Sequence, residues 1–161
     1  MTTADFSSGR NQGASKRGAE RTQSGLLVAQ EHLYTALRRP QPRRERAWGE
    51  MVSAALAAAL AALREHRLEV EAPNGLYEDI LRDSPWAEAP IRQIKAQLSR
   101  MEAEAVDLQF EVARVAGGDN QGLHAIRTEA ERLLLTLRDI LNKESDLAYE
   151  RFGATETKGA D

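Results

Sequence analysis

Apolar residues recur along this chain at steps of three and four, the spacing that gathers side chains on one side of a helix. One such stripe comprises Trp48, Val52, Ala55/Leu56, Ala59/Leu60, Leu63, His66 and Val70. It stops at Glu71-Ala72-Pro73-Asn74-Gly75, where proline cannot continue a helix and Asn-Gly accepts the positive φ of a reversal. The pattern predicts one long helix followed by a sharp turn.

Three further stripes and one short segment have the same spacing. The first covers 26–38 and ends at Arg39-Pro40-Gln41-Pro42. The short segment is 76–81. Ser84 and Pro85 then suit the start of another helix, although Pro90 allows the regular part to begin later. The next stripe ends at Gly117-Gly118 and comprises Ile91, Ile94, Leu98, Met101, Ala105, Leu108, Val112 and Val115. The final stripe covers 121–152, with Gly153 as the predicted C′ residue of its helix.

These stripes predict an all-α protein, folded as an antiparallel four-helix bundle over residues 25–153. Strand patterns are absent, and the 29% charged and 5% aromatic content is typical of helical proteins. Residues 1–24 are mostly small and polar, so we expect a disordered N-terminal tail. Residues 154–161 are expected to form a flexible C-terminal tail.

Composition excludes several classes of chemistry. The chain of 161 residues has no cysteine, which rules out disulfides, thiolate zinc sites and iron–sulfur clusters. The first ten residues contain no apolar region of a secretory signal. The most apolar run, Met51–Leu63, is 13 residues long and too short to span a bilayer. We therefore expect a soluble, cytoplasmic protein without a membrane segment.

Charge is unevenly distributed along the chain. Residues 1–48 carry nine basic and four acidic side chains, whereas residues 49–161 carry 13 and 21. A basic front on an acidic bundle is a candidate contact surface for a protein partner, and the regular third stripe would also suit a homodimer. The basic residues are not interleaved with aromatics, and no helix-turn-helix pair is apparent, which argues against nucleic-acid binding.

Candidate chemistry is limited to three histidines. His32 flanks the first stripe, His66 lies on the second, and His124 is expected at the surface. Phosphate-binding loops, nucleophile elbows and dinucleotide fingerprints are absent. Neither is there a Glu-x-x-His motif of the kind found in di-iron carboxylate bundles. A histidine on an apolar face is more often a hydrogen-bonded core residue than a metal ligand.

The stretch 63–80, LREHRLEVEAPNGLYEDI, continues to Asp83-Ser84-Pro85, and the chain closes with Asp146-Leu-Ala-Tyr-Glu-Arg-Phe152. Together with the order of His32, an Arg-rich link containing prolines and His66, these segments resemble the bacterial hemerythrin-like domain proteins. The resemblance covers residues 26–153. It implies a four-helix bundle whose core can hold a non-haem di-iron centre.

The ligand pattern that the resemblance implies is broken in this chain. His32 and His66 can stand for the first two histidines, but the position of the glutamate after His66 holds Val70. The third helix offers Leu98 and Glu102 where two histidines are needed, and the fourth offers Leu141 and Asp146. A metal with so few donors does not recover its dehydration cost.

Two hypotheses follow from this comparison. The first is a hemerythrin-like bundle that has lost the di-iron site, binds no cofactor, is not an enzyme and acts as a binding or regulatory module. The alternative is a residual non-haem iron protein that holds one metal with His32, His66 and a carboxylate, Glu102 or Asp146.

Overall fold

The structure is a computed structural model that describes the backbone of residues 4–39 and 43–158, and the side-chain surroundings of residues 13–39 and 43–150. The helices are α1 (Ala4–Arg38), α2 (Glu45–Glu71), α3 (Leu76–Asp83), the 3-10 helix η1 (Pro85–Ala87), α4 (Glu88–Ala116) and α5 (Leu123–Lys158). Within the described part of the chain there is no strand. The predicted all-α fold is confirmed.

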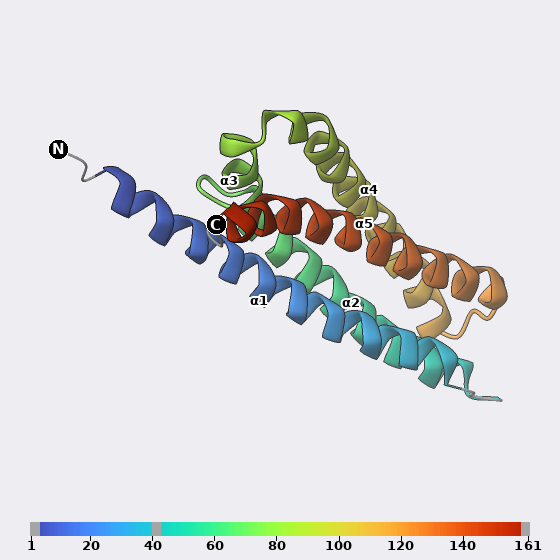
Figure 1. Cartoon of the computed structure of the whole chain (residues 1–161). Coiled ribbons are helices and arrows are strands. Elements are labelled where there is room, and N and C mark those ends of the chain that lie inside the picture. Colours follow the sequence, from blue (N-terminus) through green and yellow to red (C-terminus); the bar gives the residue numbers. More distant parts are fainter. Residues whose placement is uncertain (1–3, 40–42, 159–161) are drawn as a thin grey trace.

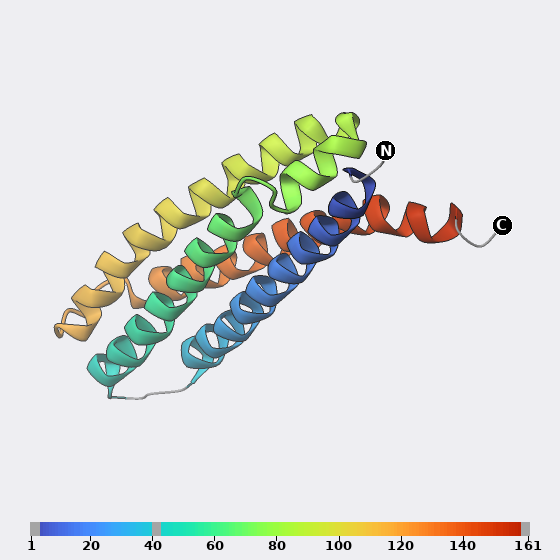
Figure 2. The same ribbon diagram turned by 90° about the vertical axis from the view of Figure 1, so that its left-hand side faces the viewer.

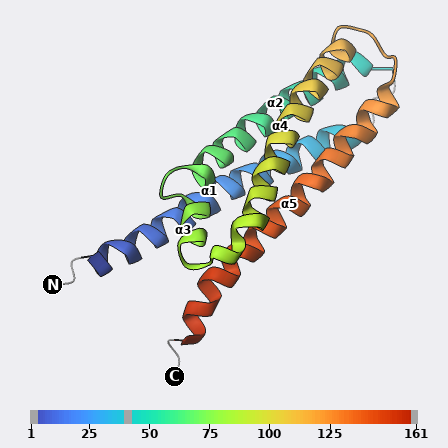
Figure 3. The ribbon, with the colours of Figure 1, turned by 90° about the horizontal axis from the view of Figure 1, so that it is seen from above.

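The four long helices form a bundle in which sequential helices run in opposite directions (Figure 1). α1 packs mainly on α2, α2 on α4 and α4 on α5, while α1 and α5 make the fewest contacts of the four neighbouring pairs. α3 lies at one end of the bundle, where it contacts both α1 and α5 (Figures 2 and 3). The bundle is therefore closed tightly on three sides and loosely on the fourth.

The predicted stripes form one continuous hydrophobic core. All eight positions of the third stripe, from Ile91 to Val115, are buried in α4, as are Trp48, Val52 and Leu56 in α2. By length and composition, the segment 45–83 also passes a test for a membrane-spanning helix, a test that core helices of soluble proteins pass too. Its apolar stripe packs inside the bundle.

The structure corrects the expectation of a disordered tail at 1–24. α1 begins at Ala4, so its helix is far longer than the predicted 26–38, and only residues 1–3 lie outside the described backbone. Ser15, Ala19 and Thr22 are buried at steps of four and three, continuing the stripe that contains Leu26. These side chains are small or hydroxylated, so hydropathy does not reveal that they face the core. Hydrogen bonds and close packing stabilise the segment instead.

The junctions between helices agree with the sequence except at the end of α5. Asn74 has a φ of 61°, the positive value expected for the reversal after α2. Pro85 begins η1 rather than α4, and Pro90 lies in the first turn of α4, where a missing N–H is tolerated. Gly153 does not end the last helix: α5 continues to Lys158. The predicted tail 154–161 is thus helical as far as Lys158, and residues 159–161 lie outside the described chain.

Candidate functional site

A row of hydrogen-bonded, buried polar side chains crosses the core near α3. His66 in α2 is fully buried, and its two ring nitrogens have different partners. Nδ1 lies 2.8 Å from the hydroxyl of Thr22 in α1, and Nε2 lies 2.7 Å from Oε1 of Glu144 in α5. The other oxygen of Glu144 accepts a hydrogen bond of 2.5 Å from the hydroxyl of Tyr77 in α3. We call these four residues the His66 network.

The positions of these residues follow from helix spacing and from one turn. His66 and Glu144 lie on the apolar stripes of α2 and α5, so burial of the stripes carries both side chains inward. The reversal at Asn74 brings α3 back beside α2, which places Tyr77 in the core with its hydroxyl toward α5. Thr22 faces His66 from the buried stripe of α1.

A second buried polar contact supports the same end of the bundle. Asp79 in α3 is almost fully buried and accepts a hydrogen bond from the hydroxyl of Ser15 in α1. Arg82 donates to the other carboxylate oxygen at 3.0 Å. Polar side chains therefore tie α3 to both α1 and α5 at this end of the bundle.

The polar atoms of the His66 network saturate one another. A carboxylate on Glu144 accepts from both Nε2–H of His66 and the phenol of Tyr77, which leaves Nδ1 to interact with Thr22. Burial raises the pKa of Tyr77 far above its ordinary value, and the negative charge of Glu144 raises it further. The phenol therefore stays protonated and remains a donor. With every polar atom of His66 and Glu144 engaged, the network is suited to holding helices together.

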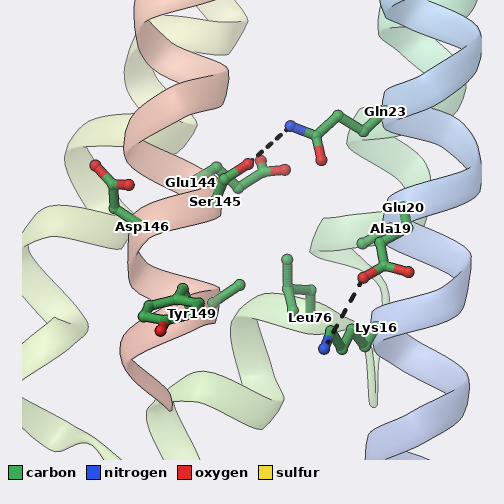
Figure 4. A pocket seen from close by; sticks show the side chains of 10 residues that line it. Lys16, Ala19, Glu20, Gln23, Leu76, Glu144, Ser145, Asp146 and Tyr149 are labelled. Carbon is green, nitrogen blue, oxygen red and sulfur yellow. Dashed lines mark hydrogen bonds and ion pairs between the residues drawn. The ribbon is translucent and has the colours of Figure 1, made fainter. Parts of the chain in front are cut away.

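One side of Glu144 borders a cleft between α1 and α5 (Figure 4). The cleft has a volume of about 430 Å³. Its apolar lining comes from Ala19, Leu76 and Ala148, and polar side chains, including Lys16, Gln23 and Ser145, stand around it. Gln23 donates a 2.9 Å hydrogen bond to Ser145 across the cleft. Tyr149 lies at the rim and is mostly exposed.

The structure does not bring the four predicted metal ligands together. His66 is buried, whereas His32 and Asp146 are exposed at the surface. Glu102 accepts hydrogen bonds from Arg64 and Arg67, and these bonds lower the pKa of its carboxyl group. Among the described residues, no group of three or more His, Cys, Asp or Glu side chains could hold a metal ion. His66 meets Glu144, a carboxylate that was not among the predicted ligands.

Aliphatic core residues occupy the positions where the resemblance to hemerythrin-like proteins implies metal ligands. Val70, Leu98 and Leu141 are each at most 1% exposed and belong to the same hydrophobic cluster. Each fills space beside other apolar side chains, as an ordinary bundle core does. An Asp or His at any of these positions would need polar partners that this cluster does not supply.

The sequence did not predict Thr22, Tyr77 and Glu144 as the other members of the His66 network. Glu144 gave a usable signal, because it interrupts an otherwise apolar stripe between Leu141 and Leu147. A carboxylate at such a position needs a buried partner, and His66 interrupts the stripe of α2 in the same way. Thr22 and Tyr77 gave no comparable signal, since both residue types are common on helix surfaces and in cores.

Comparison with known proteins adds no relative. The chain matches no family model, and searches of curated proteins and of solved structures give no match.

Proposed function

We propose that this chain is a metal-free, hemerythrin-like helical bundle that acts as a non-catalytic binding or regulatory module. The observation that supports it best is the His66 network, a histidine and a carboxylate in the bundle core whose polar atoms are already paired with protein groups. A metal ion entering there would have to displace these hydrogen bonds and would gain few donors in return.

The apolar surroundings support the same proposal. Where the resemblance to hemerythrin-like domains implies ligands, this chain has Val70, Leu98 and Leu141, all buried. Hydrocarbon side chains cannot coordinate iron, and they exclude the water that would complete its coordination. The bundle is thus proposed to retain its scaffold without the cofactor.

The cleft between α1 and α5 is the proposed binding place. It combines an apolar lining with a rim that offers an amine, an amide, hydroxyls and carboxylates, which is the make-up of small-molecule sites. Such a cleft suits a small amphipathic organic molecule. Glu144 lines the cleft and also belongs to the His66 network, so occupancy there can be sensed by the helices that the network joins.

Metal analysis tests the first half of this proposal. The full chain, His66→Ala and Glu144→Gln would be produced in iron-replete medium and analysed for bound metals by mass spectrometry. We expect far less than one metal ion per chain in all three proteins. Stoichiometric iron in the wild type with an oxo-bridge absorption band, lost in His66→Ala, would overturn the proposal in favour of a residual iron protein.

A thermal-shift screen of small amphipathic molecules tests the second half. Compounds that stabilise the wild type should lose their effect in Ala148→Trp, which places an indole in the cleft. Leu68→Glu, at an exposed position of α2 outside the cleft, should leave the effect unchanged. Stabilisation that persists in Ala148→Trp would rule out the cleft as the binding place, provided circular dichroism shows that this variant is folded.

A further inference from the structure

A second hollow lies farther along the boundary between α1 and α5, with a volume of about 540 Å³. Its lining comes from two turns of each helix and comprises Leu27, Gln30, Glu31, Tyr34, Glu131, Leu134, Leu135 and Arg138. Three of the large apolar side chains are strongly exposed: Leu27 at 46%, Tyr34 at 39% and Leu135 at 68%. Apolar groups gathered in this way at one surface indicate a protein interaction site.

Several polar groups of this face lack partners within the described part of the molecule. The surface ion pairs of α5 involve Arg132 and Lys143, and neither Glu131 nor Arg138 takes part in one with a described residue. Gln30 is only 8% exposed, and its side-chain nitrogen has no hydrogen-bond partner among those residues. Because that nitrogen is already closed off from the surface, Glu131 and Arg138 are the polar groups of this face that an incoming chain can pair.

The arrangement of the charges makes the face complementary to itself. Glu131 lies three residues before Leu134, and Arg138 lies three residues after Leu135. If a two-fold axis passes between Leu134 and Leu135, two α5 helices cross in antiparallel orientation. Glu131 then lies opposite the partner's Arg138, and Leu135 lies opposite the partner's Leu134.

The same axis also pairs the residues contributed by α1. α1 and α5 run in opposite directions, and residues 27–34 line the hollow opposite residues 131–138. The two-fold rotation therefore brings Leu27 opposite the partner's Tyr34, and Gln30 opposite the partner's Glu31.

We propose that this α1/α5 face is a homodimer interface, in which two copies of the chain pack face to face about a two-fold axis. The two-fold interface buries the same patch on both subunits, so a patch that carries both signs at equal distance from its apolar centre fits a second copy. A purely acidic or purely basic partner would match only half of these charges. The interface involves neither the His66 network nor the cleft, so its failure would leave the proposed function untouched.

Analytical ultracentrifugation of the full chain over a wide concentration range tests the interface. We expect the wild type to sediment as a monomer–dimer equilibrium. In a dimer of Glu131→Arg, two arginines face each other on each side of the two-fold axis. In a dimer of Arg138→Glu, two glutamates face each other at the same places. Each variant alone should dimerise at least about tenfold more weakly than the wild type.

An equimolar mixture of the two charge variants provides the sharpest measurement. In the mixed dimer, the arginine introduced by Glu131→Arg faces the glutamate introduced by Arg138→Glu. On the other side of the two-fold axis, the unchanged Arg138 of the first variant faces the unchanged Glu131 of the second. Both contacts are again attractive, so the mixture should dimerise about as strongly as the wild type. Failure of the mixture to recover would overturn the two-fold arrangement even if each variant is monomeric.

Two leucine variants separate this face from general surface hydrophobicity. Leu135→Glu should weaken dimerisation at least about tenfold, because it puts a charge at the apolar centre of the interface. Leu68→Glu is the matched control, since Leu68 is 76% exposed on α2 and lies outside the hollow. A wild type that remains monomeric throughout, or a dimer that only Leu68→Glu disrupts, would overturn the proposal.

Discussion

The α2/α4 and α1/α5 interfaces hold the bundle together in opposite ways. α2 and α4 meet along aliphatic stripes and approach so closely that a Cβ atom on Gly49 would lie 2.6 Å from the backbone nitrogen of Ala116. α1 and α5 make far fewer contacts, and two hollows lie between them. At their α3 end, polar side chains of the His66 network span the distance between them (Figure 4 shows the cleft beside it).

This difference shows how a bundle can be rigid and still offer binding surfaces. Close apolar packing at α2/α4 contributes stability. At α1/α5, hydrogen bonds fix the helix positions without filling the space between them. Both proposed binding surfaces, the cleft and the dimer face, therefore lie along the open interface.

The largest expected effect comes from removing the carboxylate that links α2, α3 and α5. Glu144→Ala leaves Nε2 of His66 and the hydroxyl of Tyr77 buried without partners. We expect the free energy of unfolding to fall by about 3–5 kcal/mol. Urea denaturation measures this. The control is Glu150→Ala on the exposed side of α5, with an expected change within about 0.5 kcal/mol. Equal effects of the two substitutions would show that the network does not hold the open interface.

Tyr77→Phe tests the same network with a smaller change and adds a dependence on pH. It removes one donor to Glu144 and should cost about 1–3 kcal/mol at neutral pH. In the wild type the pKa of Tyr77 is higher in the folded state than in the unfolded state. Its contribution is therefore complete below about pH 10, the ordinary tyrosine value, and is lost as the pH rises above it.

Unfolding measured across that alkaline range should show a steeper loss for the wild type than for Tyr77→Phe. Tyr149→Phe, at a tyrosine that is 77% exposed, should behave like the wild type. If all three proteins lose stability in parallel, the buried phenol does not contribute to the alkaline transition.

Two glycine substitutions compare the packed α2/α4 interface with an exposed position of α1. Gly49→Ala forces α2 away from the backbone of α4 and should cost about 1–3 kcal/mol. At Gly25, inside α1, an added Cβ meets nothing within 4 Å, and alanine should stabilise the helix by about 0.5–1 kcal/mol. Thermal unfolding of both variants measures the difference. A stabilising effect of Gly49→Ala would contradict the close approach of α2 and α4.

The regular stripes allowed most of the bundle to be predicted. Ile91 to Val115 predicted α4 because aliphatic side chains at steps of three and four bury together whatever their neighbours are. The first half of α1 could not be predicted in this way. Ser15, Ala19 and Thr22 are buried because their partners lie in α2 and α3, far away in sequence, and composition alone made this segment look like a disordered tail.

The candidate site was likewise predictable only in part. His66 was recognisable from its place on an apolar stripe, and the aliphatic residues at positions 70, 98 and 141 already argued against a di-iron cage. The pairing of His66 with Glu144 could not be predicted. The two residues are 78 positions apart, and a polar residue on each of two apolar stripes does not show that the two face each other.

By itself, the sequence determined the helices and the apolar content of the core, since periodicity and side-chain volume act locally and need no knowledge of the partner helix. Only the tertiary structure decided which polar groups meet and where the bundle stays open. A buried hydrogen bond depends on the distance and direction between two helices, and those are set by the packing of the whole chain.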